Sequence, residues 1–419
     1  MSKPDIRDEL RHQATEPLLP SHLLAGVPLD QLATSEFARH PIGSGPFALT
    51  EIDGSHATLT PAALLGSLVP GASAGDTSPA PTPTSVDSLA TPPASALPSA
   101  ATPYIERIEV QFYPDDAAAA AAFRAGDIDG VAGLAPDVAQ PLAGEPGVTR
   151  QRYPTTTLAT VLLNLRATHP ELRDVRVRRA LLGAIDRDSL VTDVLGGDAV
   201  RADTLVPPAS WAFDAESAAP VAYDTKAAAK LLDAAGWTRT AGKWVAPGAR
   251  SPYQLELLSV PADANPRLAA LAGAVADAWR SFGMDVTVVE LPAAELATRL
   301  REGKFAASVL DITTGLEPDL YPLLASTQVR GTGGNLSGYQ DPALDALLDA
   351  ARKPGTDAAR AAAWRALLAG IAAREPLLPL AWTSESVLSR GVEGASPRLI
   401  SDVGDRFWDV LAWRLAADR

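Results

Sequence analysis

The sequence contains no cysteine among its 419 residues. This absence excludes disulfide bonds, cysteine nucleophiles and thiolate zinc sites, and it leaves the redox compartment undecided. Positive charge is also scarce, because 36 Lys and Arg stand against 50 Asp and Glu, which gives a net charge of −14. No basic stripe offsets this acidity, so we expect no nucleic-acid partner.

Long apolar runs are missing as well. The longest, such as LATVLLNL (158–165), are far shorter than the roughly 20 residues that a membrane-spanning helix needs. The first residues, MSKPDIRDELRHQATEP, are charged throughout and have no apolar core of the kind that a secretory signal requires. Read literally, the sequence predicts a soluble chain without a targeting signal.

Catalytic and metal-binding motifs are absent too. The five histidines are scattered along the chain, with no HExxH motif and no pair at i, i+4 spacing. They are His12, His22, His40, His56 and His169. Because metal sites need clustered ligands, we expect no metal, and nothing in the sequence calls for a cofactor.

One segment departs from the composition of the rest. Residues 66–103 contain no Lys, Arg or aromatic residue and are dense in Pro, Ser, Thr and Ala, which predicts a disordered insertion. The segment includes GASAG (71–75), a literal match to the nucleophile elbow of esterases around Ser73. An elbow needs a strand before the serine and a helix after it, and Pro70 and DTSPAPTP oppose both. An esterase therefore stays only as a disfavoured alternative.

Elsewhere, strand patterns alternate with helix patterns, and 47% apolar residues are enough for a large core in two ordinary domains. Asp115, Asp174 and the carboxylates of IDRD (185–188) fall at helix starts, where capping explains them. Predicted strands lie at 107–113, 155–165, 254–260, 285–291, 305–311 and 376–382. Predicted helices lie at 115–126, 175–185, 223–237, 266–283, 293–303, 341–352 and 357–374.

The clearest unit, 254–311, reads strand, helix, strand, helix, strand, which predicts a parallel sheet with both faces covered. Ligands of such sheets sit beyond the carboxyl ends of the strands, so DITTG (311–315) is expected at a cleft. The stretch HPIGSGPFAL (40–49) is no phosphate loop, because it has no lysine after its second glycine and Pro46 removes one N–H donor. We interpret it as a turn that leads into a strand.

Read in order, seven motifs resemble the extracellular solute-binding proteins of peptide/nickel-type ABC importers, known as family 5. The most specific is the DVRVRRAL…AIDR signature (174–187), and the match covers nearly the whole chain from residue 16. The motifs are EPLLPSHLL (16–24), HPIGSGPFALTEI (40–52), the segments 103–131 and 163–197, YDTKAAAKLLDAAGW (223–237), EPDLYPLLAST (317–327) and GGNLSGYQDPALDALLDAAR (333–352).

The resemblance implies an α/β chain with the type-II periplasmic-binding-protein fold. One complete mixed α/β lobe is expected at 155–383, and a partial first lobe at 1–154 with a return segment at 384–419, as in an N-terminally truncated family member. The implied function is not enzymatic. The chain would be a monomeric, extracytoplasmic binding component, in the periplasm or as a cell-surface lipoprotein, that captures a peptide or other small polar solute and delivers it to a membrane permease.

The sequence departs from the family at one position of interest. Peptide binders of this family anchor the α-amine of the ligand with an aspartate that follows a tryptophan, after the strand aligned with 305–311. Here Ile312 stands at the Trp position and Gly315 at the Asp position. Asp311 or Glu317 is either a substitute anchor or a solvated loop carboxylate, and a non-peptide ligand is favoured.

The expected ligand-binding residues lie mainly at strand ends and in a Gly-rich loop. They are Trp211, Asp311, Thr313, Thr314, Tyr321, Asn335, Tyr339 and Trp382. Alternatives stay open for several of them: plain turn chemistry for Asn335 and its neighbour Ser337, and core packing for each tryptophan. A rival function is a sensor or adaptor of the same fold that binds no small ligand.

Overall fold

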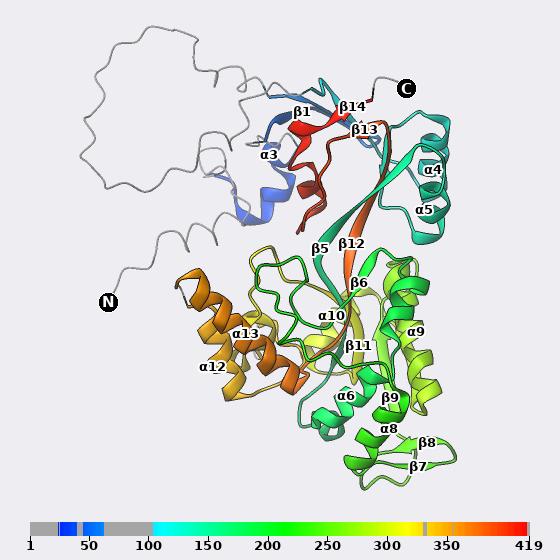
Figure 1. Cartoon of the computed structure of the whole chain (residues 1–419), viewed down its shortest axis with the longest axis vertical. Coiled ribbons are helices and arrows are strands. Elements are labelled where there is room, and N and C mark those ends of the chain that lie inside the picture. The colour runs from blue at the N-terminus through cyan, green and yellow to red at the C-terminus, as the bar shows by residue number, and fades with distance from the viewer. Residues whose placement is uncertain are drawn as a thin grey trace, which may run out of the picture.

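The computed structural model describes Leu24 and residues 26–39, 45–62, 104–329, 333–353 and 355–416 (Figure 1). Its largest sheet has seven strands in the order β10-β9-β11-β5-β12-β4, with β6 also paired to β12. These strands are β4 (Gly130–Ala132), β5 (Val148–Leu163), β6 (Ala199–Arg201), β9 (Gln254–Ser259), β10 (Asp285–Glu290), β11 (Ala307–Thr313) and β12 (Leu378–Arg390).

The predicted alternating unit is confirmed, but the sheet around it is mixed. Helix α9 (Pro266–Phe282) follows β9 and helix α10 (Ala293–Glu302) follows β10, and β9 pairs in parallel with both β10 and β11. The parallel sheet predicted for 254–311 is therefore confirmed, and the larger sheet is mixed because β5 pairs antiparallel with β11 and with β12. Helices α6, α7 and α8 lie between β5 and β9 in the chain, and helices α11, α12 and α13 lie between β11 and β12.

The predicted helices form, and their caps are the predicted ones. Asp115 accepts a hydrogen bond from the Ala118 N–H at the start of α4, and Asp174 accepts one from the Arg176 N–H at the start of α6. The helices besides α9 and α10 are α3 (Glu36–Arg39), α4 (Asp116–Ala125), α5 (Pro136–Ala143), α6 (Val175–Gly183), α7 (Arg187–Ser189), α8 (Thr225–Ala234), α11 (Tyr321–Leu324), α12 (Pro342–Ala351) and α13 (Asp357–Arg374).

The long strands β5 and β12 run together between two groups of elements (Figure 1). One group holds α6, α8 to α10, α12 and α13; the other holds α4, α5 and the smaller sheets near the C-terminus. The smaller sheets near the C-terminus comprise β1 (Phe47–Ile52), β2 (His56–Pro61) and β3 (Ile108–Gln111), and the pair β13 (Val392–Glu393) and β14 (Arg414–Leu415). A hairpin of β7 (Thr238–Thr240) and β8 (Lys243–Val245) lies beside α8 in the first group.

Apolar burial is divided in the same way. The main core surrounds the seven-stranded sheet and includes Leu158, Val161 and Trp279, each fully buried. A second, much smaller cluster centres on Phe123 and Leu142 of α4 and α5. The main core is large enough to fold as one unit, since burying each large apolar side chain contributes roughly 1.5–3 kcal/mol.

Several expectations lie outside the described residues, namely the whole insertion 66–103, which includes Ser73, and residues 40–44 of the glycine turn. The rest of that turn leads into β1, as expected. The division into lobes at 1–154, 155–383 and 384–419 stays a prediction, and its two boundaries fall inside β5 and β12.

Candidate functional site

The carboxyl end of β11 lies beside the crossing strand β5. Thr313 pairs with Thr157 across the two strands, and their hydroxyl oxygens are 3.2 Å apart and exposed to solvent. The next residue, Thr314, donates its N–H to the Thr156 carbonyl at 3.0 Å. Because the chain leaves the sheet here, these threonine side chains stand at the edge where a ligand can approach.

Asp311 does not stand free at this edge. Its carboxylate forms a two-point ion pair with the guanidinium of Arg267, with one of the two contacts at 3.3 Å. Arg267 lies in the first turn of α9, so the pair ties that helix to β11. The negative charge of Asp311 is therefore balanced from within the protein.

Trp211 joins the site from a loop that is distant in sequence. Its indole N–H donates to Glu317 Oε2 at 3.1 Å, and the other oxygen of Glu317 pairs with Arg360 of α13. The Arg360 guanidinium lies 4.3 Å from the centre of the Trp211 ring, and Trp364 packs edge-on against that ring at 6.1 Å. Trp211 remains 42% exposed, so a held aromatic ring faces solvent beside the segment that follows β11.

Asn335 and Tyr339 form a second group around α11. Asn335 is 1% exposed, and its amide donates to the carbonyls of Leu324, Ala325 and Tyr339. Its side-chain oxygen accepts from Ser337 and from the Gly338 N–H. The side chain thus satisfies the loop backbone, which favours the alternative of turn chemistry over direct ligand contact.

The hydroxyls of the two tyrosines expected at the site form polar contacts with neighbouring side chains. The Tyr321 hydroxyl is 3.0 Å from the Thr327 hydroxyl, and the Arg352 guanidinium lies over the Tyr321 ring. The Tyr339 hydroxyl donates to Asp341, and burial raises the pKa of Tyr339 above its ordinary value. Both tyrosines are half-buried.

Trp382 is buried in the main core, at 2% exposure, on β12 opposite Leu158. Its indole N–H has no hydrogen-bond partner, and neither does the hydroxyl of Thr156, which is fully buried on β5. Core packing thus accounts for the ring of Trp382. The two unpaired polar groups lie where the strands cross, which makes that crossing a place of unsatisfied hydrogen bonding.

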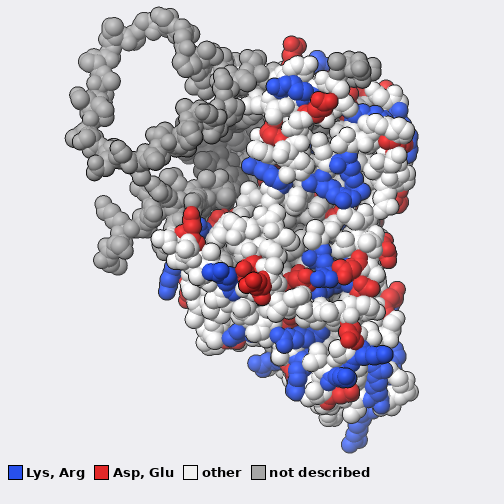
Figure 2. Space-filling model, viewed as in Figure 1, with Lys and Arg blue, Asp and Glu red and all other residues white. Residues whose placement is uncertain are grey.

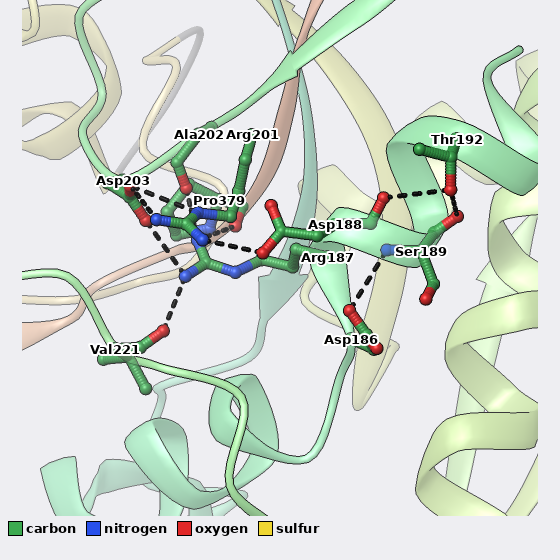
Figure 3. A network of polar contacts seen from close by, with 10 residues as sticks. All are labelled: Asp186, Arg187, Asp188, Ser189, Thr192, Arg201, Ala202, Asp203, Val221 and Pro379. Carbon is green, nitrogen blue, oxygen red and sulfur yellow. Dashed lines mark hydrogen bonds and ion pairs between the residues drawn. The ribbon is translucent and has the colours of Figure 1, made fainter. Parts of the chain in front are cut away.

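The arginines of the family-like signature have a structural task that the sequence pattern did not reveal. Arg187 is 3% exposed and donates to the carbonyls of Ala202, Pro379 and Val221 and to the carboxylate of Asp203 (Figure 3).

Arg178 is buried in the same way, with donors on the carbonyls of Leu172, Arg173, Arg374 and Glu375. Both arginines join α6 and α7 to the chain around β12, so the most specific motif of the sequence stabilises the scaffold.

A small cavity of about 20 Å³ lies beside this network and is lined in part by Arg187, Asp203 and Glu375. It is large enough for about one water molecule. Burial raises the pKa of the Glu375 carboxyl to about 7, although the guanidinium groups of Arg179, Arg187 and Arg178 pull it downward. Sequence reasoning gave no sign of this buried acid.

Neither a metal-ligand cluster nor a membrane-spanning helix occurs among the described residues. Within the residues that the structure describes, no three His, Asp or Glu side chains gather as a metal site would require. No described helix combines the length and apolarity that crossing a bilayer requires. On the face in Figure 2, Lys and Arg are scattered among Asp and Glu rather than gathered in one stripe.

One known protein family matches most of this chain. The family model described as bacterial extracellular solute-binding proteins, family 5 Middle, matches residues 6–333. The chain belongs to this family. The resemblance seen in the sequence motifs is thereby confirmed.

The curated relatives in family 5 are much longer than the part of them that matches this chain. The chain is 28% identical over 302 residues to the nickel-binding periplasmic protein of Escherichia coli, covering 70% of this chain and 56% of the relative. It is 26% identical over 340 residues to the oligopeptide-binding protein AppA of Bacillus subtilis, covering 80% and 55%. The chain thus spans about half the length of these relatives.

Solved structures of similar proteins show the fold. NikZ from Campylobacter jejuni in complex with Ni(L-His) superimposes with a TM-score of 0.66 at 21% identity, covering 94% of this chain and 72% of that one. A putative peptide-binding protein AppA from Clostridium difficile gives 0.73 at 16% identity, covering 95% and 72%. The expected α/β, type-II periplasmic-binding-protein fold is therefore confirmed.

Proposed function

We propose that this family 5 chain is the solute-binding component of an ABC importer and not an enzyme. It captures a peptide or other small polar solute between two lobes outside the cytoplasm, as a monomer, and delivers it to membrane permease subunits. The observation that carries the proposal is the end of β11, where the hydroxyls of Thr157 and Thr313 are exposed and the exposed ring of Trp211 is hydrogen-bonded to Glu317 of the segment that follows. Family membership supports it.

Capture would occur by movement of the two lobes about β5 and β12. The pairing of these strands shifts register between Pro379 and Ala381 and again between Trp382 and Ser384. Such irregularities interrupt the ladder, so the backbone there can absorb a change of direction more easily than a regular pair. A ligand that contacts both lobes would then shift the population toward the closed state.

Each expected site residue has a place in this proposal. Thr313, Thr314 and Trp211 contact the solute, and Tyr321 follows them in the chain at the start of α11. Asp311, paired with Arg267, holds the end of β11. A supporting role behind the wall is proposed for the other three, which are Asn335, Tyr339 and Trp382.

Native mass spectrometry of the gently purified chain tests the proposal. A defined small-molecule adduct is the expected result, and the released molecule gives the ligand class. Thr313→Val should then weaken its binding about fivefold, because one hydrogen bond contributes about 1 kcal/mol. Thr240→Val, at an exposed threonine of the β7–β8 hairpin, is the matched control and should leave the affinity unchanged.

A bare chain that is not stabilised in a thermal melt by peptides, sugars or metal chelates would contradict the proposal. That result would favour the rival function, a sensor or adaptor that uses the same fold without a small ligand. Light scattering of the purified chain tests the monomer in the same preparation.

A further inference from the structure

The chemical class of the solute can be read from the surface that follows β11. We call this surface the β11 wall and define it as Thr157, Trp211 and residues 311–319. Every carboxylate of the segment 307–329 is already paired with an arginine that lies in α9, in α13 or directly after α12. The ion pairs are Asp311–Arg267, Asp319–Arg352 and Glu317–Arg360.

These carboxylates are poorly placed to bind a ligand ammonium. Both oxygens of Glu317 are engaged, one by Arg360 and one by the Trp211 N–H. The Glu317 and Arg360 side chains are only 19% and 14% exposed. A ligand amine that took this carboxylate would leave Arg360 largely buried without its partner, which is strongly unfavourable.

The most exposed side chains of the wall, Thr313 and Trp211, are neutral, whereas the paired carboxylates of Asp311 and Asp319 are 24% and 25% exposed. The hydroxyls of Thr157 and Thr313 are exposed, and each can both donate and accept a hydrogen bond. The Trp211 ring, 42% exposed, adds a flat apolar surface. Exposed hydroxyls at the end of β11 and an aromatic ring hydrogen-bonded to Glu317 of the same segment complement a molecule that has hydroxyl groups around its rim and C–H groups on its face.

The ring is also held in place before any ligand arrives. The Trp211 N–H is fixed by Glu317, Arg360 lies against the ring, and Trp364 packs edge-on. A surface that is ordered in advance loses less conformational entropy on binding, so it can contribute directly to affinity. The charged groups of the wall therefore orient the tryptophan rather than the ligand.

We infer that the β11 wall selects a neutral, hydroxyl-rich solute with a flat apolar face, such as a saccharide ring, and not a solute anchored by its amine. This inference rests on the proposed function. It assigns Trp211 as the residue that determines specificity.

Isothermal titration with three sets of probes tests it on the full chain: neutral disaccharides, tri-alanine, and N-acetylated tri-alanine. A disaccharide is expected to bind, with an affinity that changes less than threefold between 50 and 500 mM salt. Trp211→Ala should weaken that binding at least tenfold. Trp408→Ala removes another half-exposed tryptophan, far along the chain near the C-terminus, and should leave the affinity unchanged.

Other outcomes would overturn the inference. They also show whether the proposed function stands or fails with it. Binding of tri-alanine that N-acetylation abolishes would show that an ammonium is recognised, so the inference fails while solute binding stands. Disaccharide binding that Trp211→Ala leaves unchanged would remove Trp211 as the determinant. If no probe binds and native mass spectrometry finds no adduct, the proposed function fails and the inference fails with it.

Discussion

Glu375 shows how a single residue can couple the scaffold to pH. It ends α13 in a left-handed conformation with φ of 46°, where a residue other than glycine is strained, and its side chain is buried beside Arg187. Burial raises the pKa of the carboxyl from 4.5 to about 7. The folded protein therefore holds this proton more tightly than the unfolded chain does.

The sign of the pH effect follows from that difference. The contribution of Glu375 to stability is fully present below the unfolded pKa of 4.5 and is lost as the pH rises through about 7. Glu375→Gln keeps a neutral side chain at every pH. We expect it to raise the free energy of unfolding at pH 8, by up to about 3 kcal/mol relative to its effect at pH 4.5.

Urea unfolding of both proteins at pH 4.5, 6 and 8 measures this difference. Glu106→Gln, at an exposed glutamate, is the control and should show no comparable change with pH. An effect of Glu375→Gln that is the same at all three pH values would mean that the carboxyl has the same pKa in the folded and unfolded protein.

Arg187, unlike Glu375, is a buried side chain whose charged form stabilises the fold. Its guanidinium reaches three carbonyls and Asp203 from one planar group, which a lysine ammonium cannot do (Figure 3). Arg187→Lys is expected to lower the free energy of unfolding by about 3 kcal/mol. The exposed Arg173→Lys should change it by less than about 0.5 kcal/mol, and equal effects in urea unfolding would contradict the structural role.

At the scale of elements, one loop holds the two crossing strands together. Asp198, just before β6, pairs with Arg150 and Arg152 of β5 and accepts from the Ser386 hydroxyl of β12. Its backbone carbonyl also accepts from the Ser384 N–H at 3.0 Å. The loop is thus bonded to both strands over the stretch between the two groups of elements.

Removing this carboxylate should loosen the crossing locally. Asp198→Ala leaves Arg150, whose side chain is only 14% exposed, without its counter-charge. We expect amide hydrogen exchange in 148–154 and 384–390 to accelerate about tenfold, while exchange in β9 stays unchanged. Asp193→Ala, at an exposed aspartate of the same region, is the control, and equal exchange in both variants would exclude a bracing role.

Local signals predicted the elements well where the deciding contacts are local. The caps Asp115 and Asp174 and the unit at 254–311 formed as predicted because each depends on neighbours in sequence. Strand β5 begins at Val148, seven residues before the predicted start. That stretch contains Arg150, Arg152 and Pro154, which do not look like a strand, and what holds the two arginines there is Asp198, nearly fifty residues away.

The site was predictable only in part, for the same reason. The sequence placed Thr313 and Thr314 at a strand end correctly, but not the pairing of Trp211 with Glu317, which are 106 residues apart. It could not separate a ligand contact from turn chemistry at Asn335, because the two uses of an amide differ only in which partner is near. A pattern of residue types and spacings does not show which residues distant in sequence come into contact.

At the scale of the whole molecule, burial is uneven between the two groups of elements. The main core packs both sides of the seven-stranded sheet, whereas β1, β2 and β3 contain one buried apolar residue, Ala57, among their described positions. An apolar cavity of about 150 Å³ lies between this small sheet and the C-terminal turns, lined by Phe47, Leu59 and Phe407 among others. Few packed side chains therefore hold this sheet against opening.

Uneven burial predicts uneven protection of the backbone. Because amides exchange through local opening wherever few apolar contacts resist it, amides of β1 to β3 should exchange at least a hundredfold faster than those of β9 and β11. Along β5 and β12, protection should fall near 154/155 and 383/384, where the proposed lobes meet. Hydrogen-exchange mass spectrometry on the intact chain resolves both effects. Uniform protection across the sheets would mean that the chain opens as one unit, and the division into a weakly packed first lobe and a self-sufficient second lobe would then be wrong.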